Sequence, residues 1–193
     1  MAVPLHKLTI GEFLEWENAQ ETRHEFYGGE VFAMVGVRRV HALISGNLFA
    51  ALKAHLKDTR CRAFTESVKV QVANETVFYP DVFVTCDAQD LKTDMVFRSP
   101  SLIVEVLSGS TQAYDRGLKF TAYRQLASLQ EYVLVDPDNR RVEVYRRNER
   151  QNFELIDQTG HAELVLDSVG MRLAMAEVFD GVEEPAGSGV GTG

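Results

Sequence analysis

Two acidic residues lie inside apolar segments that have the composition of buried strands. Asp81 follows Pro80 at the start of one segment, and Glu105 lies between two valines of the other. Because an unpaired carboxylate is costly to remove from water, such groups are normally paired, hydrogen-bonded, protonated or bound to a cation. Two acids on neighbouring strands therefore indicate a shared cation. Hard oxygen ligands with open positions for water suit Mg²⁺, with Mn²⁺ as an alternative.

The elements around these acids predict one mixed α/β domain. Apolar residues recur at helical spacing over 41–57, and a helix should follow the turn and N-cap residues at 108–111 and run to about residue 126. A capping box at 9–12 predicts a first helix that ends near residue 19, and a short final helix is expected over 174–179. Strands are expected at 22–27, 30–35, 62–65, 67–72, 82–86, 102–107, 131–135, 141–146, 153–156 and 163–166, with Gly28 and Gly29 forming the first hairpin turn.

Length and composition fit a single globular unit. The chain has 193 residues, of which 45% are hydrophobic and 25% are charged. We expect a domain over 1–182 and a disordered tail over 183–193, which has almost nothing to bury. The sequence has no apolar run of the roughly 20 residues that would span a bilayer, and residues 1–7 lack the features of a secretory signal. These observations predict a cytoplasmic protein without a membrane partner.

The overall charge limits how the chain could meet nucleic acid. A net charge of −8 opposes coating of nucleic acid through the field of the whole protein. A local cluster is still available at Arg140, Arg141, Arg146, Arg147 and Arg150. These arginines bracket a predicted strand or hairpin, where a solvated edge and a phosphate track are both consistent with the pattern.

Other reactive residue types have ordinary structural interpretations. Cys61 and Cys86 are far apart and form no paired metal-ligand motif, so we expect two reduced, buried thiols. His41 opens the long helix and is expected to face solvent, with a phosphate contact as the alternative. The sequence contains no glycine-rich phosphate loop and no nucleophile elbow, which excludes kinase, triad-hydrolase and dinucleotide-binding interpretations.

Several motifs together resemble a known family. Pro80-Asp81, Glu105-Val106-Leu107-Ser108, Asp115 with Lys119, and the segment 131–137 are similar to the putative restriction endonuclease family of the PD-(D/E)XK nuclease superfamily. The likeness extends to residues 23–31 and 176–179 and covers nearly the whole chain. It implies a single-domain restriction endonuclease-like fold of the α/β class, in which a central mixed β-sheet is flanked by helices. It also implies metal-dependent cleavage of nucleic acid.

The resemblance assigns roles to five residues. It implies that Asp81 and Glu105 are metal ligands and catalytic residues, with the carbonyl of Val106 and the upstream acid Glu25 as further ligands. The superfamily's second-strand lysine is replaced by Leu107, and the matching basic residue is Lys119 on the following helix. Four-residue spacing puts Asp115, Lys119 and Tyr123 on one helix face, which makes this replacement sterically sensible.

The sequence therefore leads to one main hypothesis with alternatives. The main hypothesis is a divalent-metal-dependent endonuclease that hydrolyses DNA, with a local DNA contact or a homodimer that brings two sites together. The alternatives are a catalytically inactive nuclease-fold protein that binds nucleic acid or protein, and a metal-stabilised structural protein. Each residue also has an ordinary explanation: turn chemistry for Asp81, a wet strand face for Glu105 and Glu25, and a simple ion pair with Asp115 for Lys119.

Overall fold

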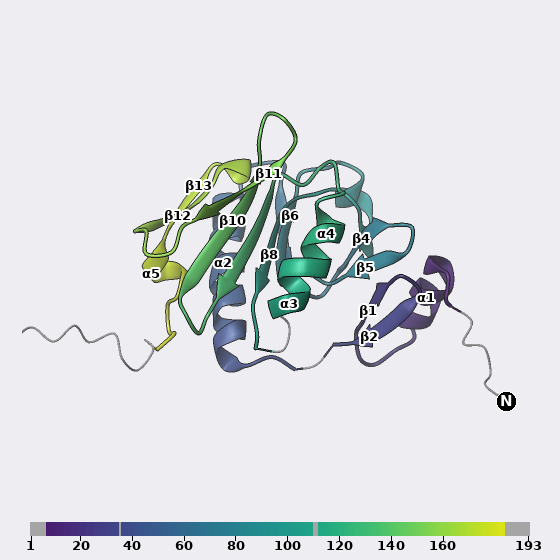
Figure 1. Ribbon diagram of the computed structural model, residues 1–193. Helices are drawn as coiled ribbons and strands as arrows, with labels where there is room; N and C mark the ends of the chain where they lie inside the picture. Colours follow the sequence, from purple (N-terminus) through teal and green to yellow (C-terminus); the bar gives the residue numbers. More distant parts are fainter. Residues whose placement is uncertain (1–6, 35, 110–111, 184–193) are drawn as a thin grey trace, which may run out of the picture.

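A six-stranded mixed sheet forms the centre of the molecule (Figure 1). The computed structural model describes residues 7–34, 36–109 and 112–183. Strands β8 and β9 run parallel, and the other neighbouring strands of this sheet run antiparallel. The predicted central mixed sheet is therefore confirmed. In spatial order its strands are β11 (Phe153–Asp157), β10 (Arg141–Arg147), β9 (Glu131–Asp136), β8 (Pro100–Val106), β6 (Val82–Thr85) and β3 (Arg62–Thr65).

One face of the central sheet is covered by the long helix α2 (Arg39–His55). Its residues Ile44, Leu48 and Leu52 are fully buried and pack in one cluster with alternate valines and leucines of β6, β8 and β9. Side chains alternate between the two faces of a strand, so even-numbered residues of β8 face this helix and odd-numbered residues face away. Glu105 therefore projects toward the face that α2 does not cover.

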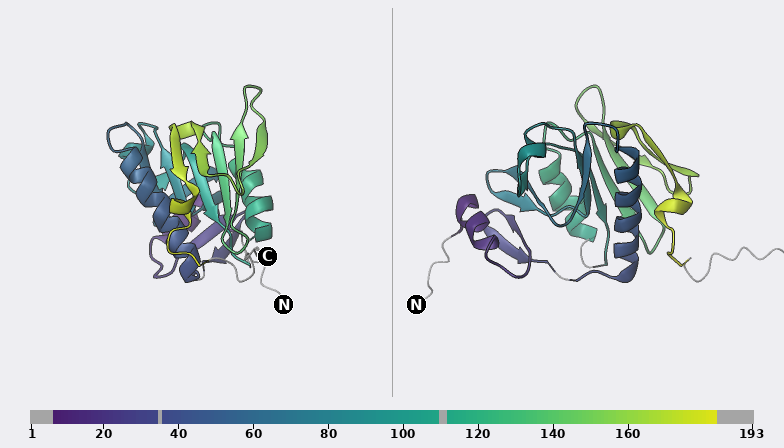
Figure 2. Two further views of the ribbon diagram at one scale, coloured as in Figure 1. Left: turned by 90° about the vertical axis from the view of Figure 1, so that its left-hand side faces the viewer. Right: turned by 180° about the vertical axis from the view of Figure 1, so that it is seen from behind.

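The opposite face is covered by a second helical segment, and the left view of Figure 2 shows the sheet between this segment and α2. The segment consists of α3 (Gln112–Tyr114), the π-helical η2 (Asp115–Lys119) and α4 (Phe120–Tyr123). Single π turns inside helices are frequent at functional sites. The helix expected here is confirmed, although it ends at Tyr123 rather than at about residue 126.

A five-stranded sheet packs beside the central one and carries the N-terminal elements. Its hairpin turns at Gly28 and Gly29, whose φ angles of 58° and 88° are those that the glycine pair predicts. Helix α1 (Ile10–Glu17) has the predicted capping box between Thr9 and Glu12. The sequence prediction did not include β5, which has only three residues. The spatial order is β2 (Glu30–Ala33), β1 (His24–Tyr27), β5 (Thr76–Phe78), β4 (Lys69–Ala73) and β7 (Val96–Phe97).

The C-terminal elements close the α2 face of the central sheet. Strand β12 (Glu163–Leu166) pairs with β13 (Met171–Ala174), which the sequence prediction omitted, across the 3₁₀ turn η3 (Asp167–Val169). The final helix α5 (Met175–Val178) is shorter than expected, and its Val178 is buried with α2 in the same core cluster. The tail predicted to be disordered lies, from residue 184 on, outside the described residues.

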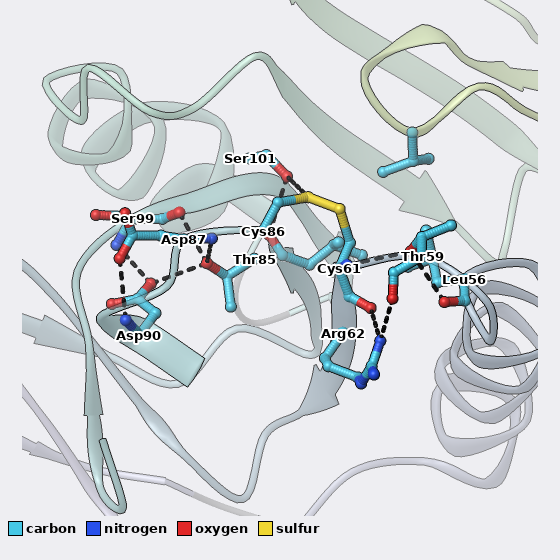
Figure 3. The surroundings of a disulfide bond; sticks show 12 residues. Leu56, Thr59, Cys61, Arg62, Thr85, Cys86, Asp87, Asp90, Ser99 and Ser101 are labelled. Atoms are coloured by element: carbon cyan, nitrogen blue, oxygen red, sulfur yellow. Dashed lines mark hydrogen bonds between the residues drawn. A yellow bond between two sulfur atoms is a disulfide. The ribbon is translucent and has the colours of Figure 1, made fainter. Parts of the chain in front are cut away.

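The two cysteines form a disulfide between the neighbouring ends of β3 and β6 (Figure 3). The expectation of two reduced thiols is therefore wrong. Arg62 pairs with Thr85 across these antiparallel strands, which places Cys61 and Cys86 opposite each other one residue further out. The two cysteines are 25 residues apart in the sequence, so their contact can be predicted only when the pairing of β3 with β6 is known.

The connection over 87–99 begins beside this disulfide and is more ordered than its polar composition suggests. It contains the 3₁₀ turn η1 (Asp90–Lys92) as well as β7. The buried carboxylate of Asp90 accepts hydrogen bonds from the Thr85 hydroxyl and the backbone N–H of Ser99 (Figure 3). It also accepts a hydrogen bond from the backbone N–H of Arg98. Within the described residues, no helix is both long and apolar enough to cross a membrane.

Candidate active site

The pairing of β6 with β8 brings the two strand acids together. Val82 pairs with Val104, and Asp81 and Glu105 lie one residue beyond this pair on their respective strands. The backbone N–H of Val106 donates a hydrogen bond to Asp81 Oδ2 at 2.6 Å. Glu105 is almost fully buried, whereas Asp81 is partly exposed. The acids therefore share one end of the central sheet, as their positions in the sequence predicted.

Lys119 reaches the same place from the π-helical segment. Its Nζ lies 2.9 Å from Glu25 Oε1, 3.2 Å from Glu105 Oε1 and 3.6 Å from Asp115 Oδ1. The hydroxyl of Tyr123 donates to the same Glu105 oxygen at 3.2 Å. The predicted common face of Asp115, Lys119 and Tyr123 is thus present. Lys119 does more than pair with Asp115, because it also contacts an acid of the N-terminal hairpin, Glu25, and an acid of β8, Glu105.

The position two residues after Glu105 takes no part in this cluster. Leu107 is buried in the hydrophobic core beneath α4. Lys119 therefore supplies from the helix the positive charge that the strand lacks.

Glu25 comes from the five-stranded sheet and is also buried. Its Oε1 accepts a hydrogen bond from the backbone N–H of Tyr79 at 3.2 Å, in addition to contacting Lys119. The alternative that Glu25 lies on a solvent-exposed strand face is wrong, since its side chain is only 9% exposed. This burial could not be predicted from the sequence, because the neighbouring residues are charged and a four-residue strand shows too little alternation to identify its buried face.

His41 is the site residue that the sequence reasoning placed wrongly. It is buried rather than solvent-facing, and its Nε2 lies 3.1 Å from Asp81 Oδ2. The signal was available, since residues 41, 45, 48 and 52 lie on one helical stripe that includes two core leucines. Burial lowers the pKa of His41, but the hydrogen bond and charge of Asp81 outweigh that effect and hold the pKa above its usual value.

The cluster carries more negative than positive charge. Four carboxylates, from Glu25, Asp81, Glu105 and Asp115, surround the single ammonium of Lys119. Burial raises the pKa of Glu105 well above its ordinary value; Lys119 opposes the rise and the other acids add to it. Burial disfavours the charged form of Lys119, yet the acids outweigh it and raise the pKa of Lys119 well above the usual value. Lys119 is therefore a cation at neutral pH.

The donor set has the chemistry of a site for a hard divalent cation. Carboxylate oxygens are the ligands that Mg²⁺ and Mn²⁺ prefer, and the excess negative charge would be offset by such an ion. Over residues 7–34, 36–109 and 112–183, no three Asp, Glu, His or Cys side chains are already arranged as a metal cage. Instead, the ammonium of Lys119 lies among the acids. The residues fit a cation by donor type and charge, with Asp81 at the partly exposed edge of the cluster and Glu105 buried behind it.

The arginine cluster is largely engaged by the protein itself. Arg146 bonds Glu131 and contacts Asp167, while Arg147 donates to the carbonyls of Leu129 and Leu126. Arg141 donates to Glu143 on its own strand. These contacts belong to the β9–β10–β11 edge and favour its structural interpretation over a phosphate track.

Comparisons with known proteins agree on one family. A family model described as "Uma2: Putative restriction endonuclease" matches residues 10–176. Two uncharacterized proteins of Synechocystis sp. are similar: slr1290 is 35% identical over 94% of this chain and 96% of its own length, and sll1609 is 34% identical over 72% and 81%. A solved structure of a putative nuclease belonging to DUF820 from Anabaena variabilis is 21% identical, with a TM-score of 0.73 over 89% of this chain and 97% of that one. That structure shares the fold.

Proposed function

Because the chain belongs to the Uma2 family of putative restriction endonucleases, we propose that it is a divalent-metal-dependent endonuclease that cleaves phosphodiester bonds in DNA. The family resemblance noted in the sequence and the restriction endonuclease-like fold are both confirmed. The metal, the substrate and the roles of individual residues are our proposal.

The observation that carries the proposal is the buried convergence of Glu25, Glu105 and Lys119 beside Asp81. A fold gains little stability from burying so many charges, because their desolvation offsets much of their attraction. Strongly perturbed pKa values in such a cluster are typical of functional sites. The family resemblance also implies that residues of this cluster are catalytic.

Each side chain has a definite task in this proposal. Asp81 and Glu105 would hold the cation, with Glu25 and the Val106 carbonyl as further ligands. Such a cation polarises a phosphate oxygen and lowers the pKa of a bound water. Lys119 keeps its positive charge beside Glu105, where it would stabilise negative charge that develops on the phosphate.

Three groups hold the ligands in place. The Val106 N–H and His41 Nε2 both contact Asp81 Oδ2, and together they fix the orientation of that carboxylate. The Tyr123 hydroxyl does the same for Glu105. Ligands held by such secondary contacts need little rearrangement when a cation binds.

The direct experiment is cleavage of supercoiled plasmid and single-stranded DNA in Mg²⁺, Mn²⁺ or EDTA. We expect cleavage with either metal, none in EDTA, and none from Asp81→Ala or Glu105→Ala. Glu163→Ala is the matched control, because Glu163 is an exposed acid on β12. Equal cleavage by all of these proteins would show a contaminating nuclease and contradict the proposal.

A second candidate function is a nucleic-acid or protein-binding module without catalysis. One observation favours it: Lys119 already offsets charge among the acids, and the described residues form no ready metal cage. This alternative predicts metal-independent binding of DNA that survives Glu105→Gln. Metal-dependent nicking would exclude it.

The assembly and compartment remain predictions. The net charge of −8 requires a local contact with DNA, to which a homodimer could add a second site. Sedimentation of the purified protein would detect a homodimer. The disulfide weighs against the predicted cytoplasmic location, because disulfides are rare in reducing compartments. Chemical trapping of the protein's thiols in its own cells would test that location.

A further inference from the structure

A pocket of about 580 Å³ opens directly beside the acid cluster. Asp81 lines it, and α2 contributes His41, Ser45 and Gly46. Further lining residues come from the chain on either side of the β1–β2 hairpin. The pocket volume lies in the range of sites that bind small organic groups.

Two buried polar groups in this pocket have no partner among the described residues. His41 is 7% exposed and its Nδ1 makes no hydrogen bond, although its Nε2 contacts Asp81. Ser45 is 8% exposed and its hydroxyl is also unpaired. A buried polar atom without a partner is costly, and native proteins usually satisfy such atoms. His41 and Ser45 thus line the pocket one helical turn apart on α2, and each has a buried polar atom without a partner.

The charges of the pocket show what kind of group it suits. Glu21, Glu66 and Asp81 line it, against a single cation, Arg23. This balance disfavours a phosphate in the pocket itself. Apolar contacts are supplied by Met34 and other lining residues. A neutral group that offers both hydrogen-bond donors and acceptors fits these walls.

We propose that the pocket receives the nucleobase adjacent to the scissile phosphate, so that the preferred substrate is single-stranded or locally unpaired DNA. This inference rests on the proposed endonuclease function. A nucleobase is neutral and flat, and it carries the donors and acceptors that Ser45, His41 Nδ1 and the nearby acids can meet. A base must leave the helical stack to enter such a pocket, which costs least where it is unpaired or mismatched. Asp81 belongs to both sites and places the pocket next to the reacting phosphate.

The test uses a helix position that opens into the pocket. A Cβ added at Gly46 meets no atom within 4 Å, and Gly46 lies inside α2, so Gly46→Phe should fold while filling the pocket. Gly46→Ala is the matched control, because alanine also favours the helix and leaves the pocket open. Ser45→Ala is a second variant that removes only a hydroxyl.

Binding is measured by fluorescence anisotropy in Ca²⁺ with two short DNA duplexes, one fully matched and one with a single mismatch. We expect about tenfold tighter binding of the mismatched duplex, a difference that Gly46→Phe abolishes, Ser45→Ala reduces and Gly46→Ala retains. Equal affinity of the unaltered protein for both duplexes, or an unchanged preference in Gly46→Phe, would overturn the inference.

A second readout separates this inference from the proposed function. Bis(p-nitrophenyl) phosphate has no nucleobase, so Gly46→Phe should hydrolyse it in Mn²⁺ as fast as the unaltered protein does. If the unaltered protein hydrolyses neither this ester nor DNA, the endonuclease proposal fails. The preference for mismatched DNA still tests whether the pocket receives a nucleobase. Equal loss of ester hydrolysis and mismatch binding in Gly46→Phe would instead show damage to the acid cluster and overturn the separate pocket.

Discussion

Lys119→Met removes the single ammonium from the acid cluster and leaves Glu25, Glu105 and Asp115 buried without it. Methionine keeps the length and packing of the lysine side chain. Breaking a buried ion pair by removing one partner costs about 3–5 kcal/mol, because the remaining charge is uncompensated. The unfolding free energy of a domain is about 5–15 kcal/mol, so this single change should remove a large part of it.

The sign of the pH effect follows from the pKa shifts. The pKa of Lys119 is raised, so the stability that it contributes is fully present below its ordinary pKa and is lost only as pH rises through the raised value. At neutral pH the full contribution is therefore lost in Lys119→Met. Acidification protonates Glu105, whose pKa burial raises, and should reduce the deficit.

Urea denaturation with and without Mg²⁺ measures the effect. We expect a lower unfolding free energy in EDTA and a larger recovery with Mg²⁺ than in the unaltered protein; a ligand at about 100 times its Kd adds about 2.7 kcal/mol. Lys69→Met is the matched control. Lys69 is buried but donates to the neutral Asn18 side chain, and burial lowers its pKa, so its loss should cost only about 1 kcal/mol and bring no metal response.

Similar denaturation curves for the two lysine variants, with no effect of Mg²⁺ on either, would refute this reasoning. That result would mean that the acids are protonated or solvated in the folded protein. The cluster would then need no cation, and the argument for a metal site would lose its physical basis.

Three further predictions concern other parts of the same structure. Glu105→Gln keeps an acceptor for Tyr123 but removes one buried charge, so it should abolish metal-dependent cleavage without lowering the melting temperature in EDTA. His41→Gln should lose less stability at about pH 9 than at about pH 6 in urea denaturation, because the raised pKa of His41 makes its contribution full below the ordinary pKa and lost above the raised one. Reduction of the disulfide, or Cys61→Ser, should lower the unfolding free energy by about 2–4 kcal/mol, as urea denaturation with and without reductant would show.

Local signals allowed much of the fold to be predicted from the sequence. The Gly28–Gly29 turn and the capping box at Thr9 are encoded within a few neighbouring residues, and both are present. The two strand acids stand out because a charge inside an apolar run needs a partner. Strands β5, β7 and β13 were missed: β5 and β7 have only three and two residues, and β13 runs directly into α5, so its last residue was assigned to the final helix.

Features that depend on strand pairing could not be predicted in the same way. The contact of Cys61 with Cys86 needs the register of β3 against β6. The burial of Glu25 needs the five-stranded sheet to pack against the helical segment that carries Lys119. The prediction for His41 was wrong for a different reason. A polar residue at the start of a helix is usually exposed to solvent, but His41 lies on the same face of α2 as the buried core leucines.

The most direct test of the proposed metal centre is a crystal structure with Mn²⁺ and a DNA strand whose scissile phosphate cannot be hydrolysed. We expect an anomalous difference peak bound by Asp81 and Glu105, with a phosphate oxygen of the DNA also bound to the metal. An active protein whose Mn²⁺ lies elsewhere, with Lys119 still holding Glu105 and no metal between the two strand acids, would contradict the proposal.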